Sequence, residues 1–419
     1  MPVIQVLEPG LFTTVQDLGR EGFGLLGVSP SGAADSVSLR MGNRLVGNAE
    51  GEAGLEMTLL GGAFLFPEGA VLVLAGSDFG ATLDGKPVEL WRRFEARAGQ
   101  VLRLGPTQSG ARCYLCVLGG IEVELLLGSA STHVLSGLGG HEGRALRKGD
   151  VLKIGTHRWK MPSGWSASFR KREWVLSDRV LDALESRKEL RVTDGPQSDW
   201  FSEAAKKVFY ESTYRVAEES NRMGIRLQGP AIPAPAGGEM ISEGVALGAV
   251  QVPEGGQPII LFVEQQTTGG YPKIANVASV DFHCLGQLRP RDEIRFRRVE
   301  RLGARSMLAL QEMVLTSDLR DRRMLPYESR KINKILHRSM QLDRLRRRHP
   351  MQRANLHQIR PILSSIAHWN LHAPRLRKLH LFQSLDIPTQ NCFQLLMPHS
   401  KRIKLHQQRA IPRMQIAHS

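Results

Sequence analysis

The chain has 419 residues, of which 42% are hydrophobic and 23% charged, so it is long enough for two or three domains with buried cores. The net charge of +15 would suggest a nucleic-acid or anionic-membrane partner, but residues 316–419 hold 21 of the 56 basic and 5 of the 41 acidic residues. That segment carries +16 and the preceding 315 residues carry −1. We therefore expect no nucleic-acid and no membrane partner.

Four cysteines are too few for a disulfide scaffold in a chain of this length. The first residues, "MPVIQVLEPG", lack the basic region and apolar core of a signal peptide, and no apolar run is long enough for a membrane helix. These features predict a protein of the reducing cytoplasm.

The N-terminal stretch 7–48 is rich in glycine and polar residues. Within it, "SGAADSVSLRMGNRLVGN" predicts a helix capped by Ser31 or Asp35, with Val37, Met41 and Leu45 on one face. The stretch fits either a surface loop followed by a helix or a pocket wall to which Asp35 and Asn43 contribute.

Residues 55–155 and 190–297 consist of short apolar runs separated by turn residues, which is typical of antiparallel β structure. The two regions end alike, in "GRALRKGDVLKIG" and "LGQLRPRDEIRFR". Either a β-barrel unit is duplicated or the two regions share common turn sequences. Helices are few: we expect one within 196–212, capped by Ser198, and one from about Arg298.

Two motifs in the first region do not support a cofactor site. "GATLDGKP" (80–87) resembles a phosphate-binding loop, but Pro87 stands in place of the required hydroxyl residue and Asp84-Gly85 indicates a hairpin turn. "CYLC" (113–116) has metal-like spacing, but residues three apart on a strand face opposite ways. We expect two buried thiols there and no metal site.

The stretch "EQQTTGGYPKI" (264–274) directly follows an apolar run and combines hydroxyls, bare backbone and one cation. Gly269 and Gly270 can present successive amides as an anion nest, and Thr267 and Thr268 add hydroxyl donors. Lys273 suits a carboxylate or a developing oxyanion. The stretch predicts a substrate site.

From Thr316 onwards glycine is absent and histidine is enriched, with 9 of the 13 histidines. A basic amphipathic helix is conceivable here, but aromatic residues are sparse. We interpret residues 316–419 as a basic tail that is disordered or translated out of frame.

Five blocks in order resemble the carboxyltransferase subdomain family: "GLFTTVQDLGREGFGLLGVSPSGAADSVSLRMGNRLVGN", "GGIEVELLLGSAST", "GGHEGRALRKGD", "SNRMGIRLQGP" and "EGVALGAVQVPEGGQPIILFVEQQTTGGYPKI". This family includes the C subunit of bacterial 5-oxoprolinase, allophanate hydrolase subunit 2-like proteins and kinase-inhibitor antagonists. The resemblance covers residues 3–300.

The resemblance implies a mainly β fold of cyclophilin-like β-barrels in two subdomains, at about 50–155 and 190–300. The N-terminal segment is expected on the second half, a C-terminal helix at 301–315, and the basic tail lies outside the family. Two positions depart from the family pattern: Ala130 stands where arginine is expected, which weakens an anion site in that loop, and Arg291 replaces a glycine in a turn.

The resemblance also implies a function, the ATP-dependent opening of 5-oxoproline to L-glutamate together with A-like and B-like 5-oxoprolinase subunits. The implied catalytic residues are Lys273, Asp35 and Asn43. The implied substrate-binding residues are Thr267, Thr268, Gly269, Gly270, Tyr271 and Asn48. ATP would be used by the complex, and no biotin would be attached to this chain.

Two alternatives remain open. The chain could be one half of a biotin-dependent carboxyltransferase like that of urea carboxylase, receiving biotin from another protein. It could instead be a non-catalytic antagonist that binds a kinase inhibitor resembling the B subunit.

Overall fold

The computed structural model describes residues 2–155, 174–233, 235, 240–317 and 319–321. These belong to one compact unit, Met1–Leu325, and the remaining unit, Pro326–Ser419, lies outside the described residues. The prediction for the basic tail therefore falls almost wholly outside the described part of the chain.

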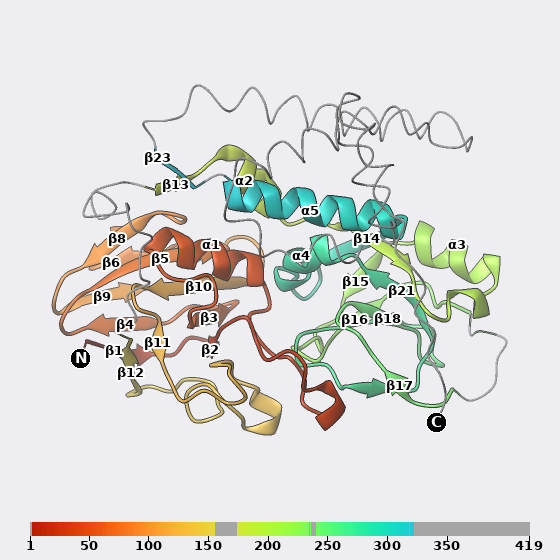
Figure 1. Ribbon diagram of the computed structural model, residues 1–419, viewed down its shortest axis with the longest axis horizontal. Coiled ribbons are helices and arrows are strands. Elements are labelled where there is room, and N and C mark those ends of the chain that lie inside the picture. The colour runs from red at the N-terminus through yellow and green to blue at the C-terminus, as the bar shows by residue number, and fades with distance from the viewer. Residues whose placement is uncertain (1, 156–173, 234, 236–239, 318, 322–419) are drawn as a thin grey trace, which may run out of the picture. The chain divides into compact units, whose positions relative to one another are not determined.

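The first half of the unit is built from two mainly antiparallel sheets that pack face to face (Figure 1). The seven-stranded sheet has the order β11 (Ile121–Glu122), β12 (Val151–Ile154), β1 (Val3–Glu8), β4 (Ala63–Phe66), β9 (Gln100–Arg103), β6 (Thr82–Leu83) and β7 (Lys86–Pro87). The five-stranded sheet has the order β2 (Phe12–Gln16), β3 (Gly54–Thr58), β10 (Arg112–Val117), β5 (Ala70–Gly76) and β8 (Arg93–Ala96).

The second half is a closed seven-stranded barrel. Its order is β14 (Glu189–Asp194), β21 (Lys273–Val277), β18 (Ala249–Gln251), β19 (Ile259–Leu261), β16 (Gly224–Gln228), β15 (Tyr214–Val216) and β22 (Glu293–Arg298). The parallel pairing of β14 with β22 closes the ring. The mainly β prediction is confirmed, although only the second half forms a closed barrel among the described residues.

Two further pairs of short strands and the helices complete the unit. The strand pairs are β17 (Glu243–Gly244) with β20 (Thr268–Gly269), and β13 (Trp174–Leu176) with β23 (Leu319–Asp321). The α-helices are α1 (Ser36–Val46), α2 (Asp178–Leu184), α3 (Glu203–Glu211), α4 (Phe282–Gly286) and α5 (Arg301–Ser317). The 3₁₀ turns are η1 (Gly24–Leu26), η2 (Val134–Ser136), η4 (Ser198–Trp200) and η5 (Ser279–Asp281).

Helix α1 begins at the predicted cap, because Asp35 accepts hydrogen bonds from the amide and hydroxyl of Ser38. Its apolar face, with Val37, Met41 and Leu45, is buried against the five-stranded sheet, as predicted. The cap prediction for α3 is wrong: Ser202 caps this helix by accepting from Ala205 N, and Ser198 opens the preceding turn η4.

The N-terminal segment packs differently from the prediction. Strands β1 and β2 pair with strands of the first half, and the stretch Ser31–Asp35 forms hydrogen bonds with the second half. Ser31 N donates to Val263 O, and Gly32 O accepts from Arg222. Strand pairing explains this arrangement. β1 lies between β4 and β12, and its backbone amides and carbonyls form hydrogen bonds there.

The two short motifs in the first half have the predicted structures. Asp84 and Gly85 both have positive φ, 47° and 79°, in the tight turn between β6 and β7. Cys113 and Cys116 are buried on opposite faces of β10 and belong to different core clusters. Burial raises the pKa of both thiols well above its ordinary value.

Candidate functional site

The predicted lysine lies at the start of β21, in the wall of the barrel, and is 2% exposed. Its Nζ lies 2.6 Å from Oε1 of Glu243 in β17, whose side chain is 44% exposed. Gln197 links both residues, since its Nε2 donates to Glu243 Oε1 at 2.9 Å and its Oε1 accepts from Lys273 N at 3.2 Å. We call these three residues the Lys273 cluster.

The Lys273 cluster holds a charge that is already paired. The hydrogen bonds from Lys273 and Gln197 lower the pKa of Glu243 below its ordinary value. Glu243 therefore stays ionised at neutral pH, and an anion or a polarised carbonyl must share the ammonium with this carboxylate. The sequence did not single out Glu243 or Gln197, because each is distant from Lys273 along the chain.

The glycines of the predicted nest have a different role. Neither Gly269 nor Gly270 has positive φ, and Gly269 lies in β20, opposite Glu243 of β17. A Cβ at Gly269 would lie 2.5 Å from Gln251 Nε2. The nest prediction is therefore wrong in this structure: glycine at this position allows close approach of the Gln251 amide.

The other predicted residues of the loop differ in exposure. Thr268 and Tyr271 are exposed, Thr267 and Gly270 are half-buried, and Gly269 is buried. Thr267 lines a cavity of about 300 Å³ between the glycine-rich N-terminal loop and the barrel. Other residues lining this cavity, which we call the Arg20 cavity, are Arg20, Glu21, Pro30, Val245 and Gln265.

The three polar residues predicted from the N-terminal motif are all buried and bonded to the protein. Asp35 caps α1 and accepts from Gln287 Nε2 at 2.7 Å. Asn43 donates to the carbonyls of Glu50 and Glu52, and Asn48 bridges Asn43 Oδ1 and Val117 O. Within the described part of the chain, the structure shows no hydrogen bond between these residues and the Lys273 cluster.

A buried ion network between the two halves was missed by the sequence analysis. Arg222 lies 2.5 Å from both Glu56 of β3 and Glu264 of the barrel, and Tyr114 donates to Glu56 at 2.7 Å. Burial alone lowers the pKa of Arg222, but the two carboxylates raise it above its ordinary value. Arg222 and Glu264 stand inside conspicuous motifs, yet nothing in the sequence indicates their pairing with Glu56.

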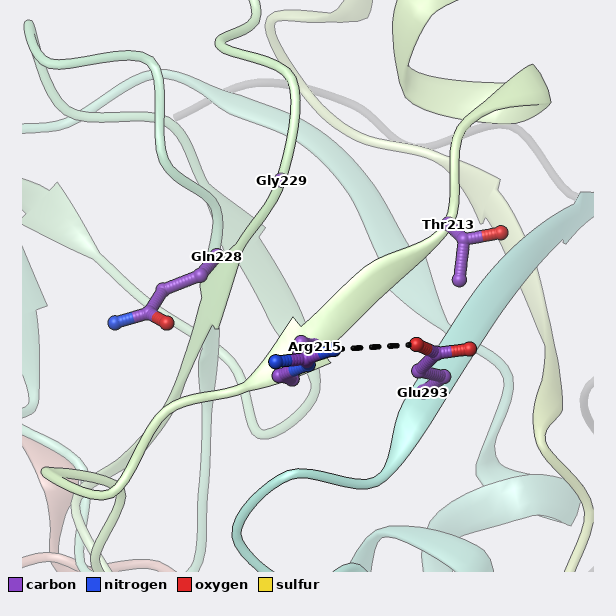
Figure 2. A pocket seen from close by; sticks show the side chains of 5 residues that line it. All are labelled: Thr213, Arg215, Gln228, Gly229 and Glu293. Atoms are coloured by element: carbon purple, nitrogen blue, oxygen red, sulfur yellow. Dashed lines mark ion pairs between the residues drawn. The ribbon is translucent and has the colours of Figure 1, made fainter.

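A second hollow, of about 400 Å³, lies on the outside of the barrel. Figure 2 shows its lining residues, in which Arg215 of β15 forms an ion pair with Glu293 of β22 at 3.6 Å. Both side chains of this pair are 59% exposed. This hollow is open and polar, and it includes no residue of the Lys273 cluster or the Arg20 cavity.

The described residues show neither a metal site nor a nucleotide loop. No group of three or more metal-ligating side chains occurs among them. Residues 80–87 form a hairpin and not the loop-to-helix turn that cradles phosphates, so they do not fit ATP and we derive no reaction step through it in this chain. No helix in the described ranges has the length and apolar character needed to cross a bilayer.

The family model and the relatives that match this chain indicate the same protein family. The model of the carboxyltransferase domain, subdomain A and B, matches residues 26–298. The 5-oxoprolinase C subunit of Escherichia coli is 38% identical over 68% of this chain and 88% of its own length. The Haemophilus influenzae protein of the same name is 34% identical over 75% of this chain and 96% of its own.

Solved structures agree with these relatives. The crystal structure of TTHA0988 superposes with a TM-score of 0.61 and 37% identity, covering 71% of this chain and 56% of that one. Kluyveromyces lactis urea amidolyase gives a TM-score of 0.67 and 30% identity, covering 75% of this chain and 20% of that one. The chain thus spans about half of TTHA0988 and a fifth of the urea amidolyase.

Proposed function

Because the chain belongs to the carboxyltransferase domain family, subdomains A and B, we propose that it is the C subunit of an ATP-dependent 5-oxoprolinase. One observation carries the proposal: the chain matches 88–96% of the length of two proteins that are named as the C subunit of 5-oxoprolinase. The similarity to a yeast urea amidolyase covers 18% of that protein, so the activity of that whole enzyme supports the proposal less directly.

The proposed reaction opens the lactam of 5-oxoproline to give L-glutamate, in the cytoplasm, with partners like the A and B subunits of 5-oxoprolinase. A lactam is a stabilised amide, so attack on its carbonyl carbon develops negative charge on the amide oxygen, and a fixed cation next to that oxygen stabilises the transition state. Lys273 is the residue proposed for this role. Lys273 is enclosed, whereas its partner Glu243 is partly exposed. The ammonium could therefore donate a hydrogen bond to the substrate oxygen while it remains next to Glu243.

The remaining predicted residues take supporting roles in this proposal. Thr267, Thr268, Gly269, Gly270 and Tyr271 shape the loop between the Arg20 cavity and Lys273, where substrate would bind. We propose that Asp35, Asn43 and Asn48 act by fixing α1 and its connections, because their side chains bond to protein groups. ATP is proposed to act in the assembled complex.

Reconstitution tests this function directly. The pure chain should not hydrolyse 5-oxoproline, whereas the chain mixed with the A and B subunits should release glutamate and consume ATP. Omission of each protein in turn is the control, and avidin should have no effect if biotin takes no part. Unchanged glutamate with all three proteins present would contradict the proposal, and inhibition by avidin would favour carboxyl transfer.

A further inference from the structure

The loop that follows β11 is bonded to the guanidinium of Arg20, which is 2% exposed. Its Nε donates to Leu126 O at 3.3 Å and its Nη2 donates to Ser131 O, both in the loop that follows β11. Its Nη1 is enclosed and has no hydrogen-bond partner in the described part of the chain. A buried charged group normally has its donors satisfied, so this free donor next to a cavity calls for an acceptor.

The barrel contributes an unpaired acceptor to the same cavity. Gln265 donates through Nε2 to Val245 O at 3.3 Å, but its enclosed Oε1 accepts no hydrogen bond from any described residue. Gln265 and Arg20 both line the Arg20 cavity, together with Thr267. The residues lining the cavity therefore include one cationic donor, Arg20 Nη1, and one neutral acceptor, Gln265 Oε1, and neither atom has a hydrogen-bond partner among the described residues.

Asp17 and Glu264 lie near enough to raise the pKa of Arg20, but no carboxylate among the described residues forms an ion pair with it. Burial lowers the pKa of Arg20, and Asp17 and Glu264 oppose this shift only in part. Asp17 already accepts from Gly19, Ser129, Ala130 and Ser131, and Glu264 is bound to Arg222. Glu21 also lines the cavity but is exposed, so its charge is screened by water.

The Arg20 cavity and the Lys273 cluster flank the same strand pair. Val245 directly follows β17, which supplies Glu243, and Thr267 directly precedes β20. A small ligand in the cavity thus lies against the strand pair that carries the partner of the proposed catalytic lysine.

We propose that the Arg20 cavity recognises a small cyclic amide that carries a carboxylate, with Arg20 Nη1 donating to the carboxylate and Gln265 Oε1 accepting from the ring N–H. A guanidinium selects a carboxylate, and an amide oxygen selects a neutral N–H donor. The inference rests on the proposed function for the choice of 5-oxoproline as the ligand. It adds two positioning residues for substrate recognition to that function.

The test pairs changes in the protein with matched changes in the ligand. Binding of 5-oxoproline, 2-pyrrolidinone and N-methyl-5-oxoproline is measured by calorimetry on the full chain, alone and mixed with the A and B subunits, without ATP. Arg20→Gln should weaken 5-oxoproline about tenfold or more but change 2-pyrrolidinone, which lacks the carboxylate, less than about twofold. Gln265→Met should weaken 5-oxoproline several-fold but leave N-methyl-5-oxoproline, which lacks the N–H, nearly unchanged.

Arg215→Gln is the matched control, because it makes the same change at an exposed arginine outside the cavity and should leave 5-oxoproline binding within about twofold. The inference is overturned if wild-type protein binds no 5-oxoproline in either state, or if the variants weaken all three ligands equally. If Arg20→Gln does not fold, the selective effect of Gln265→Met decides.

Turnover by the reconstituted wild-type complex separates this inference from the proposed function. Glutamate release with an unchanged KM in the Arg20→Gln complex would overturn the inference alone. Absence of turnover together with ligand-selective losses in binding would overturn the proposed function and leave the recognition site standing.

Discussion

Lys273 illustrates how an enclosed ammonium group is paired with a carboxylate that remains partly open to water. The ammonium is 2% exposed and Glu243 lies 2.6 Å away, so the attraction within the pair offsets part of the cost of removing the charge from water. Since Glu243 is 44% exposed, water can take over its solvation when a substrate oxygen approaches the lysine. The pair is therefore suited to exchange of partners.

Lys273→Ala should lower the activity of the assembled complex by roughly a hundredfold or more, because the cation next to the amide oxygen is lost. Binding to the B subunit should be unchanged. The measurements are initial rates of glutamate release and co-purification of the two proteins. A rate near that of the wild type would mean that residues 264–274 form a structural loop and not a catalytic site.

Two further variants separate charge from geometry at this position. Lys273→Arg keeps the charge but should not restore the rate, because a guanidinium fork does not fit a site built for an ammonium. Glu243→Gln keeps the shape of the carboxylate and should affect the rate less than Lys273→Ala does.

Asp150 gives a pH-dependent prediction. Hydrogen bonds from Arg144 and from the amide of Arg147 lower the pKa of Asp150 to about 2. The folded-state pKa is depressed, so the stabilisation is complete above the unfolded value near 4 and is lost as the pH falls from about 4 to about 2.

Asp150→Asn should reduce the free energy of unfolding at pH 7 by roughly 1 kcal/mol, after allowance for solvent screening. The difference from the wild type should shrink as the pH is lowered to 2. Urea titrations across this range measure it, with the exposed Glu124→Gln as control. A difference that is constant with pH would mean that the carboxylate charge is not the cause.

At the scale of elements, local patterns predicted the secondary structure better than the contacts between elements. The α1 cap at Asp35 and the Asp84-Gly85 hairpin follow from a few neighbouring residues, and both are confirmed. The cap of α3 was misplaced because Ser198 and Ser202 both precede acidic residues, and only the backbone turn of η4 distinguishes them.

The same reasoning explains which parts of the candidate site the sequence could predict. The loop 264–274 and its lysine stand out by composition, and the lysine is indeed enclosed. Its pairing with Glu243 depends on the register of β17 with β20, which no local pattern indicates. Arg291 shows the reverse case: the resemblance predicted glycine there, and the residue has a left-handed φ of 72°.

The ion network around Arg222 joins elements of both halves, so its removal should be costly. Arg222→Met should lower the free energy of unfolding by about 3–5 kcal/mol, because Glu56 and Glu264 would each remain buried without this partner. Arg215→Met is the matched control, since the Arg215–Glu293 pair is exposed (Figure 2) and should contribute less than about 1 kcal/mol. Chemical denaturation measures both, and equal losses would contradict a special role for the network.

Across the whole compact unit, α5 connects the two halves (Figure 1). Glu312 forms a bidentate ion pair with Arg40 of α1, and Leu315, 1% exposed, packs in the same core cluster as α1. At the other half, Gln311 donates to Val280 O of η5. The helix extends to Ser317, beyond the predicted end at residue 315, and strand β23 follows it.

These contacts determine where the chain can be shortened without loss of α5 when the basic tail is removed. A chain ending at Gln311 loses Glu312 and Leu315 and should unfold at a lower temperature, since burial of one leucine contributes about 1.5–3 kcal/mol. A chain ending at Asp321 keeps α5 and β23 and loses 20 basic and 3 acidic residues, a net charge of +17. It should therefore retain the melting temperature, be more soluble at neutral pH and bind the B subunit. Thermal unfolding and co-purification compare the two truncations with the full chain. A lower melting temperature or lost binding for the chain ending at Asp321 would show that residues 322–419 belong to the working protein.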